Sequence, residues 1–487
     1  MTSTIPFDTT ELLIGGRWRG AESGQTLQLD NPSDGTPLAR IARGSAADID
    51  AAVVAARTAR DSGEWGQLTA TERGRLLAAI GRKVAEQADW LAELEALDVG
   101  KPLRQGRADA LALARYLEFY GGAADKLHGQ TLPYQRGFTV MTLREPHGVT
   151  GHIVPWNYPM QIVGRSVGAA LAMGNACVLK PAEEACLTVL AFARIATEAG
   201  LPPGALNVVP GLGEEAGAAL SAHRGIDHIS FTGSVATGVL VQAAAAKNAV
   251  PVTLELGGKS PQIVFADADI ERALPFLVNA GIQNAGQTCS AGSRLLVERA
   301  VYERVRDAMA ERVRALRVGP AMHDLDVGPL ISKRQHDIVG GFLALARDSG
   351  LKVAAQAQLV ADAPKGGHYL PPTLLDAVPA DHALAQQEIF GPVQVLTPFD
   401  GEAEAIALAN GTDFGLVAGV WTRDGGRQLR MAHALRCGQV FINNYGAGGG
   451  VELPFGGVKR SGHGREKGFE ALYGFSTLKT VAIDHSA

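Results

Sequence analysis

The sequence is poor in cysteine and has no motif that would pair its cysteines. Only four occur among the 487 residues, at positions 177, 186, 289 and 437. They are widely spaced and form no CxxC pair, so we expect neither a disulfide framework nor a metal site. A chain of this length can bury large cores without such cross-links. Because a domain usually has roughly 100–200 residues, we expect two to four domains.

Charge of one sign and long apolar runs are also absent. The net charge is −5 and no block of five like charges occurs, so we expect no nucleic-acid partner. No apolar stretch reaches the roughly 20 residues of a membrane-spanning helix. Residues 1–18 lack the basic and apolar regions of a signal peptide. We therefore expect no membrane partner and a cytoplasmic location.

What is present predicts a folded α/β protein. Residues 47–126 have apolar residues three and four apart, which predicts helices. Further along, short β-rich runs alternate with helical stretches. The runs are 148–154, 176–179, 205–209, 228–231, 262–265, 293–297 and 415–421, and the helical stretches include 186–199 and 214–222. This alternation predicts parallel sheets in two lobes that join near 255–262.

Cys289 is the candidate nucleophile. It lies in the segment 284–294, NAGQTCSAGSR, whose small and polar residues would leave the sulfur accessible and surrounded by backbone N–H groups. A thiolate needs both access and local positive potential to be reactive. A lone cysteine is more often a small buried hydrophobic residue. We interpret Cys177, Cys186 and Cys437 in this second way.

Two polar side chains are candidates for the accompanying chemistry. Glu255 follows an apolar run and precedes two glycines, which predicts a strand end facing the ligand crevice. Burial would raise its pKa and make it a base near neutral pH; pairing with Lys259 is the alternative. Asn157 lies between Pro155 and Pro159. Its amide is either an oxyanion donor or part of an ordinary turn.

Two glycine-rich turns follow strands and open helices, as dinucleotide-binding turns do. The segment 231–238, FTGSVATG, would present backbone N–H groups and Ser234 to a pyrophosphate. The segment 211–217, GLGEEAG, is a weaker match. A third run, Gly446–Gly450, is expected to be a loop, either near a ligand or at the surface.

Residues 254–261, LELGGKSP, and 286–289, GQTC, resemble the paired active-site signatures of the aldehyde dehydrogenase superfamily. Five other segments match that family's motifs in the same order: 155–157 (PWN), 180–183 (KPAE), 231–234 (FTGS), 388–392 (EIFGP) and 454–457 (PFGG). The resemblance extends from 15–18 (GGRW) to 478–480 (LKT), and therefore covers nearly the whole chain.

The resemblance implies the aldehyde dehydrogenase fold with three regions. Residues 1–126 and 147–256 would form a Rossmann-like NAD-binding domain, and 257–437 a second α/β catalytic domain. Residues 127–146 and 438–487 would form a small β oligomerisation arm and the C-terminal segment. Adding an arm strand to a neighbouring subunit would cover an exposed sheet edge. A homo-oligomer is therefore implied, and both tetramers and dimers occur in the family.

The resemblance also implies NAD-dependent oxidation of an aldehyde to a carboxylic acid. Cys289 would form a thiohemiacetal, with Asn157 and the Cys289 backbone N–H binding the oxyanion, and then a thioester. Glu255 would activate the water that hydrolyses the thioester. The matching cofactor-binding positions are Ile153, Val154, Pro155, Trp156, Lys180, Ala182, Glu183, Gly213, Gly217, Phe231, Thr232, Gly233, Ser234, Leu256, Gly257, Glu388 and Phe390.

Glu183 bears on the choice of cofactor. It matches the position that binds the adenosine ribose hydroxyls, together with Lys180. A carboxylate accepts hydrogen bonds from a 2′-hydroxyl and repels a 2′-phosphate. We therefore predict NAD over NADP. Glu184 would add to the repulsion only if it also faces the site.

The resemblance says less about the aldehyde. Tyr158, Ile162, Arg165 and Phe455 match the substrate tunnel, where many relatives carry an aromatic residue in place of Arg165. That arginine would either bind a distal anion, or be solvated or paired internally. The small residues of the Gly446–Gly450 loop would leave a wide entrance, open to bulky or aromatic aldehydes.

Three other functions remain as alternatives. A CoA-acylating aldehyde dehydrogenase would usually lack the hydrolytic glutamate, whereas Glu255 is present. A non-catalytic binding protein would tolerate loss of Cys289, Glu255 or Asn157, and all three are present. A hydrolase without redox chemistry would not need the cofactor motifs.

Overall fold

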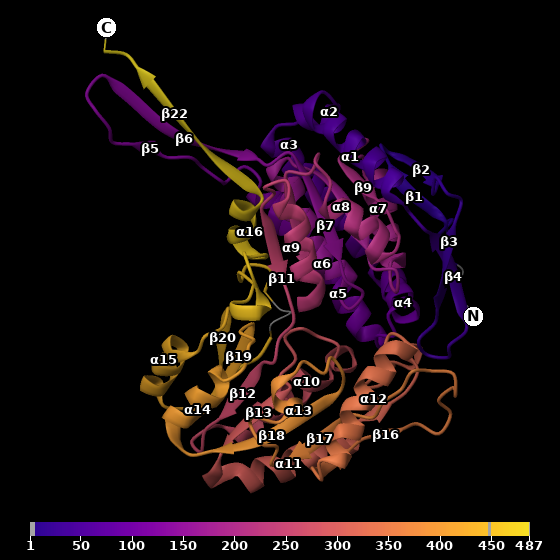
Figure 1. Ribbon diagram of the computed structural model, residues 1–487, viewed down its shortest axis with the longest axis vertical. Coiled ribbons are helices and arrows are strands. Elements are labelled where there is room, and N and C mark those ends of the chain that lie inside the picture. Colours follow the sequence, from indigo (N-terminus) through magenta and orange to yellow (C-terminus); the bar gives the residue numbers. More distant parts are fainter. Residues whose placement is uncertain (1–4, 447–449, 487) are drawn as a thin grey trace.

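Two large sheets and a projecting arm organise the computed structural model, which describes residues 5–446 and 450–486 (Figure 1). The strand order is β2-β1-β9-β8-β7-β10-β11-β21 in the first sheet and β15-β17-β18-β13-β12-β19-β20 in the second. The chain passes from the first sheet to the second between Glu255 and Pro261, within the expected range 255–262. The expected α/β fold class with mainly parallel sheets is confirmed.

The first sheet is parallel at its centre and antiparallel at its edges. From β9 to β11 all neighbours are parallel, whereas β1 and β21 run the other way. The edge strand β2 is antiparallel to β1 and so runs in the direction of the central strands. Its strands are β1 (Glu11–Ile14), β2 (Arg17–Gly20), β7 (Val149–Val154), β8 (Ala176–Pro181), β9 (Leu206–Val208), β10 (His228–Thr232), β11 (Val252–Glu255) and β21 (Gly462–His463). Strands β8 and β10 are buried along their whole length, and in β8 this burial explains the continuous apolar run Ala176–Leu179.

The helices of this part largely follow the sequence prediction. The stretch 47–126 contains α1 (Ala46–Asp61), α2 (Glu64–Gln67), α3 (Ala70–Glu86), α4 (Ala88–Asp98) and α5 (Leu103–Ala123), followed later by α6 (Pro159–Met173), α7 (Leu187–Glu198), α8 (Ala218–Ser221) and α9 (Val235–Ala246). Helix α3 begins at a capping box, in which Thr69 Oγ1 accepts from the Glu72 N–H and the Glu72 carboxylate accepts from the Thr69 N–H. The predicted helical stretch 214–222 is confirmed, with a π-helical turn, η1 (Gly213–Gly217), leading directly into α8.

The second sheet repeats the parallel arrangement, with only the edge strand β15 antiparallel. Its strands are β12 (Pro261–Val264), β13 (Arg294–Glu298), β15 (Lys352–Gln356), β17 (Thr373–Asp376), β18 (Val393–Phe399), β19 (Val417–Trp421) and β20 (Gln439–Ile442). The helices of this part are α10 (Ile270–Ile282), α11 (Tyr302–Ala315), α12 (Lys333–Asp348), α13 (Ala383–Gln386), α14 (Gly401–Asn410) and α15 (Gly425–Ala434).

A three-stranded antiparallel arm leaves the body of the molecule at the upper left of Figure 1. It consists of β5 (Thr131–Leu132), β6 (Phe138–Pro146) and β22 (Ser476–Asp484), which follows α16 (Gly468–Gly474). The segment 438–487 thus contributes one strand to each of the three sheets: β20, β21 and β22. Two short pairs, β3 (Thr26–Asp30) with β4 (Pro37–Ala42) and β14 (Arg317–Val318) with β16 (Gln358–Leu359), complete the strands.

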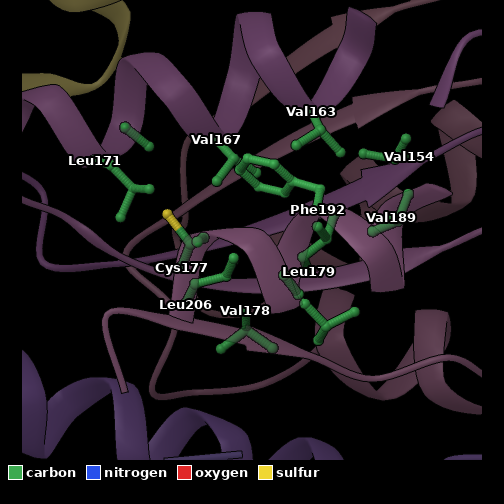
Figure 2. Close-up of a cluster of buried hydrophobic side chains, with 14 of the residues drawn as sticks. Val154, Val163, Val167, Leu171, Cys177, Val178, Leu179, Val189, Phe192 and Leu206 are labelled. Carbon is green, nitrogen blue, oxygen red and sulfur yellow. The ribbon is translucent and has the colours of Figure 1, made fainter. Parts of the chain in front are cut away.

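The core of the first sheet lies between α6, α7 and the central strands. Figure 2 shows Val163 and Val167 of α6 facing Phe192 of α7, with Cys177 of β8 in the same cluster. Burial raises the pKa of the Cys177 thiol to about 12, which makes this cysteine an inert packing residue. The structural role expected for Cys177 is thereby confirmed.

Neither a membrane helix nor a metal-binding cluster occurs among the residues that the structure describes. Within 5–446 and 450–486, no helix combines the length and apolar character needed to cross a bilayer. Over the same residues, no three His, Cys, Asp or Glu side chains gather as a metal site would require.

Candidate active site

Three parallel strands of the first sheet end at one cavity. Strands β7, β10 and β11 end at Val154, Thr232 and Glu255, and α/β proteins bind ligands at the carboxyl ends of such strands. These three residues line a cavity of about 450 Å³, to which residues 331–338 and 388–390 of the second part also contribute. The cavity therefore lies where the two parts of the molecule meet.

The structure brings nearly all the predicted site residues to this cavity. Those that line it are Asn157, Glu255, Cys289, Ile153, Val154, Pro155, Trp156, Lys180, Ala182, Glu183, Gly213, Phe231, Thr232, Gly233, Ser234, Gly257, Glu388, Phe390, Tyr158, Ile162, Arg165 and Phe455. Two predicted residues do not. A side chain at Gly217 would touch Lys180, at 3.8 Å from Cδ, and Leu256 packs instead against Gly238 of α9.

A strongly bent loop presents Cys289. Asn284, Ala285 and Gly286 all have positive φ, at 49°, 54° and 73°, and no glycine eases the first two. Contacts hold this conformation: the Asn284 N–H donates to Gln105 Oε1 at 2.9 Å, and the Ile331 N–H donates to Gln287 Oε1 at 2.9 Å. The loop that carries the nucleophile is thus tied to both parts of the molecule.

Asn157 is joined to the same loop. Its Nδ2 donates to the Gln287 carbonyl at 3.1 Å, and Asn284 Nδ2 donates to the Asn157 carbonyl at 3.0 Å. Asn157 is buried, and Tyr158 behind it caps α6 with Pro159 in the first turn. The amide is therefore held by tertiary contacts as well as by the flanking prolines.

The surroundings of Cys289 act on its thiol in opposite directions. Burial raises the pKa of the thiol to about 12, the positive charge of Arg165 lowers it, and the carboxylates of Glu388 and Glu255 raise it. Arg165 is the charged group that most favours the thiolate. Cys289 is thus partly buried at a cavity and has a cation nearby.

Glu255 is a buried carboxyl group at the end of β11. Neither of its oxygens has a hydrogen-bond partner within the described residues, so the alternative pairing with Lys259 is wrong. Burial raises its pKa well above the usual range, against the lowering effect of Arg165. A carboxyl group in this state accepts a proton readily, as a general base must.

Arg165 is paired internally, which confirms one of the two alternatives for this residue. It forms an ion pair with Glu466, donates from Nη2 to Thr232 Oγ1 at 3.3 Å, and lies over the Phe455 ring at 5.0 Å from its centroid. Its side chain is 9% exposed. Glu466 was not predicted, because a buried glutamate near the C-terminus carries no local signal of its partner.

The other end of the cavity carries the features of a nucleotide site. Lys180 Nζ donates to Glu183 Oε2 at 2.7 Å, and the Gly213 N–H reaches Glu183 Oε1 at 3.4 Å. Ser234 caps α9, a helix of 12 residues, by accepting from the Thr237 N–H at 3.2 Å. Glu184 also lines the cavity.

Between the two ends lie Glu388 and Phe390. The Gly258 N–H donates to Glu388 Oε1 at 2.9 Å, and burial raises the pKa of Glu388 to about 7. A Cβ on Gly257 would lie 2.0 Å from Glu388 Oε2, so any larger residue there would displace the Glu388 carboxyl group. Phe390 has a positive φ of 55° and meets Trp156 edge to face, with ring centroids 5.3 Å apart.

A second cavity, of about 870 Å³, adjoins the first beside Cys289. Both are lined by Gln161, Gln283, Thr288 and Ser290, so they form one route to the thiol. Of the predicted entrance loop Gly446–Gly450, Gly446 lines this second cavity, whereas residues 447–449 lie outside the described residues.

Several residues at the cavity were not among the predicted site residues. Those missed are Tyr116, Gln161, Thr237, Gln283, Thr288, Ser290, Ile331, Ser332, Arg334, Gln335, Ile338 and Lys467. Thr288 and Ser290 adjoin the candidate cysteine and could have been included on that ground. Residues 331–338 come from a segment whose approach to the first sheet only the tertiary structure reveals.

A serine motif within α6 is not a second nucleophile. Residues 164–168, GRSVG, fit the GxSxG pattern of serine hydrolases. That pattern requires a sharp turn between a strand and a helix, whereas Ser166 lies inside α6 and donates to the Ile162 carbonyl at 2.8 Å. Its side chain is buried and is used in the helix itself.

Comparison with known proteins finds similarity to aldehyde dehydrogenases along nearly the whole chain. The model of the aldehyde dehydrogenase family matches residues 18–481. Aldehyde dehydrogenase family 2 member B4, mitochondrial, from Arabidopsis thaliana is 42% identical over 481 residues, which are 98% of this chain and 89% of that protein. A solved protein from Burkholderia cenocepacia is 65% identical with a TM-score of 0.97, covering 98% of this chain and all of the other. The NAD+ complex of an aldehyde dehydrogenase from Bacillus cereus is 40% identical with a TM-score of 0.95, covering 98% and 97%.

The bend before Cys289 gives a first prediction, for Gly286→Ala. A Cβ at Gly286 would lie 2.2 Å from the Gly391 carbonyl oxygen, at a φ of 73°. The backbone must shift, so we expect the free energy of unfolding to fall by about 1–3 kcal/mol. Denaturant unfolding measures it.

Gly425→Ala is the matched control, since a Cβ there meets no atom within 4 Å. We expect the control to change stability by less than about 1 kcal/mol. Equal stability of the two variants would contradict the account of the bend.

Proposed function

The chain belongs to the aldehyde dehydrogenase family, and we propose that it oxidises an aldehyde to a carboxylic acid with NAD as the hydride acceptor. The observation that carries this proposal is that Cys289, Asn157 and Glu255 line one cavity, which continues to Lys180 and Glu183. Overall, the aldehyde, NAD and water give the carboxylic acid, NADH and a proton.

Cys289 forms the first bond to the substrate. Its sulfur attacks the carbonyl carbon to give a thiohemiacetal, and negative charge develops on the oxygen. An amide nitrogen has two hydrogens, and the bond from Asn157 to Gln287 uses one of them. The other supports an oxyanion-binding role for Asn157. Because Asn157 is held by the loop of Cys289, donor and nucleophile keep a constant relative position.

NAD fits the remainder of the cavity. A Glu183 carboxylate beside Lys180 suits ribose hydroxyls, the first turn of α9 at Ser234 suits phosphates, and Glu388 suits the second ribose. When bound, NAD supplies the hydride acceptor that turns the thiohemiacetal into a thioester. The NAD+ complex of the similar Bacillus cereus protein supports this choice.

Glu255 completes the reaction as the base. Its unpartnered carboxylate takes a proton from water while the oxygen attacks the thioester, which releases the acid and regenerates the Cys289 thiol. A CoA-acylating enzyme would have no use for this group. Hydrolysis of the acyl group by water is therefore the better-supported last step.

The proposal extends to the assembly. Residues 1–126 and 147–256, which carry every strand of the first sheet except β21, would be the NAD-binding domain, and 257–437 the catalytic domain. The arm formed by β5, β6 and β22 exposes Leu478 and Ile483 on an edge strand, which supports a homo-oligomer of dimeric or tetrameric size. A cytoplasmic location stays a prediction.

The direct test is NADH formation by the purified protein. We expect absorbance of NADH with NAD and at least one of a panel of aliphatic, aromatic, amino- and carboxyl-bearing aldehydes. Cys289→Ala should lower the rate by at least about a thousandfold, as loss of a nucleophile does. Cys437→Ala serves as the matched control and should retain activity. NADH formation by Cys289→Ala at the wild-type rate would contradict the mechanism.

The pH dependence of acyl-enzyme hydrolysis tests Glu255. Because burial raises the pKa of Glu255 and the base must be ionised, hydrolysis should speed up with rising pH. Glu255→Gln should abolish this rise and slow hydrolysis by about 10²–10⁴-fold. An activated ester such as 4-nitrophenyl acetate measures the step without NAD, as a burst followed by a slow phase. A steady rate in Glu255→Gln equal to that of the wild type would refute the assignment.

Cofactor choice is tested at Glu183. The wild-type protein should have a higher kcat/KM with NAD than with NADP, and Glu183→Gln should shift the ratio towards NADP by about tenfold, because the repelling charge is lost. Glu303→Gln on α11 removes an equal charge far from the cavity and should leave the ratio unchanged. Equal use of both cofactors by the wild type would contradict this interpretation.

A further inference from the structure

Arg165 lies at the place where the nucleophile and the base meet. It projects from α6 and lines the cavity together with Cys289 and Glu255. Three other segments hold its guanidinium: Glu466 by an ion pair, Thr232 by a hydrogen bond of 3.3 Å, and Phe455 by its ring face. A cation held in this way cannot turn towards solvent or follow a ligand.

The partner Glu466 is itself immobile. It is fully buried, and its Oε1 accepts from Ser230 Oγ at 2.6 Å. Its backbone pairs with that of Phe455 in both directions, at 2.7 and 2.8 Å. If Arg165 moved away, a buried carboxylate would lose its counter-charge, which is strongly unfavourable. Glu466 and Phe455 thus form one rigid support for the guanidinium.

The positive charge of Arg165 acts on the ionisation of both Cys289 and Glu255. Arg165 is the charged group that most favours the ionised form of both, since it lowers the pKa of each. The negative charges of Glu388 and Glu255 raise the pKa of Cys289. The negative charge of Glu466 raises the pKa of Glu255. Further positive charges that act on Glu255 come from residues 465 and 467.

We propose that Arg165 is a positioning residue whose immobile positive charge, shared by the two reacting groups, favours the thiolate of Cys289 and the carboxylate of Glu255. The inference rests on the proposed function, because that function gives the two groups their roles. It differs from a substrate-binding role, since contacts with Glu466, Thr232 and Phe455 fix the position of the guanidinium without a ligand. One cation thereby supports both the first and the last bond-making step.

The test separates the effect of the Arg165 charge from the effect of its shape and hydrogen bonds. We would measure the rate of Cys289 alkylation by iodoacetamide against pH, identifying the modified peptide by mass spectrometry. Arg165→Met should move the midpoint up by one pH unit or more, which lowers the rate at neutral pH by about tenfold or more. Arg165→Lys, which keeps the charge, should stay within about threefold of the wild type.

Arg299→Gln is the matched control, because it removes an exposed arginine paired with Asp400 at the surface. It should leave the alkylation profile unchanged. A wild-type profile in Arg165→Met would overturn the inference. Equal slowing in Arg165→Met and Arg165→Lys would overturn it too, since shape and hydrogen bonds would then explain the effect.

A measurement on the wild-type protein covers the case in which Arg165→Met does not fold. A positive potential at the thiol should make anionic iodoacetate react faster, relative to neutral iodoacetamide, than it does with free cysteine. A ratio at or below that of free cysteine would overturn the inference. Alkylation needs neither aldehyde nor NAD, so its outcome is separate from that of the NADH assay, which tests the proposed function.

Discussion

The hydrogen bonds between Asn157 and the loop 284–287 are the interactions on which the site depends. Asn157 belongs to the connection between β7 and α6, whereas the loop follows α10 in the other part of the molecule. Bonds of 3.1 and 3.0 Å join them. Both amides are buried, so separating them would leave polar groups unsatisfied. Since Cys289 follows two residues after Gln287, the same bonds determine where the thiol lies relative to the amide.

Two buried cations near this junction are each compensated by carboxylates. Lys101 is paired with Glu95 and Asp109 and lies 4.0 Å from the centroid of the Tyr158 ring, behind Asn157. Arg165 is compensated by Glu466 in the same manner. The contrast with Glu255 is therefore informative, because a buried carboxyl group without partners is costly unless it serves a purpose. Lys101 and Arg165 are thus stabilised by ion pairs, whereas Glu255 is left without a partner and is available for reaction.

The periodicity of apolar residues in the sequence was enough to predict the main helices and strands. The helices of 47–126 and the parallel strands could be predicted because burial on one or both faces leaves a period of 3.6 or a continuous apolar run. Spacing could not bring Cys289, Glu255 and Asn157 together; the family motifs suggested it and the fold places them at one cavity. The pairing of Arg165 with Glu466 and the left-handed turn at Asn284 were beyond reach. Both are imposed by tertiary contacts between segments far apart in the chain.

The Asn157–Gln287 bond spans 130 residues of chain, and the contact of Asn284 with Gln105 spans 179. Contacts of such sequence separation form late, because the entropy of closing a long loop must be overcome first. A growing chain that ends after β11 would lack both the loop 284–287 and Ile331, whose N–H donates to Gln287. The reactive arrangement of Cys289 and Asn157 therefore forms only in a chain whose two parts have docked. Partly folded chains lack this arrangement.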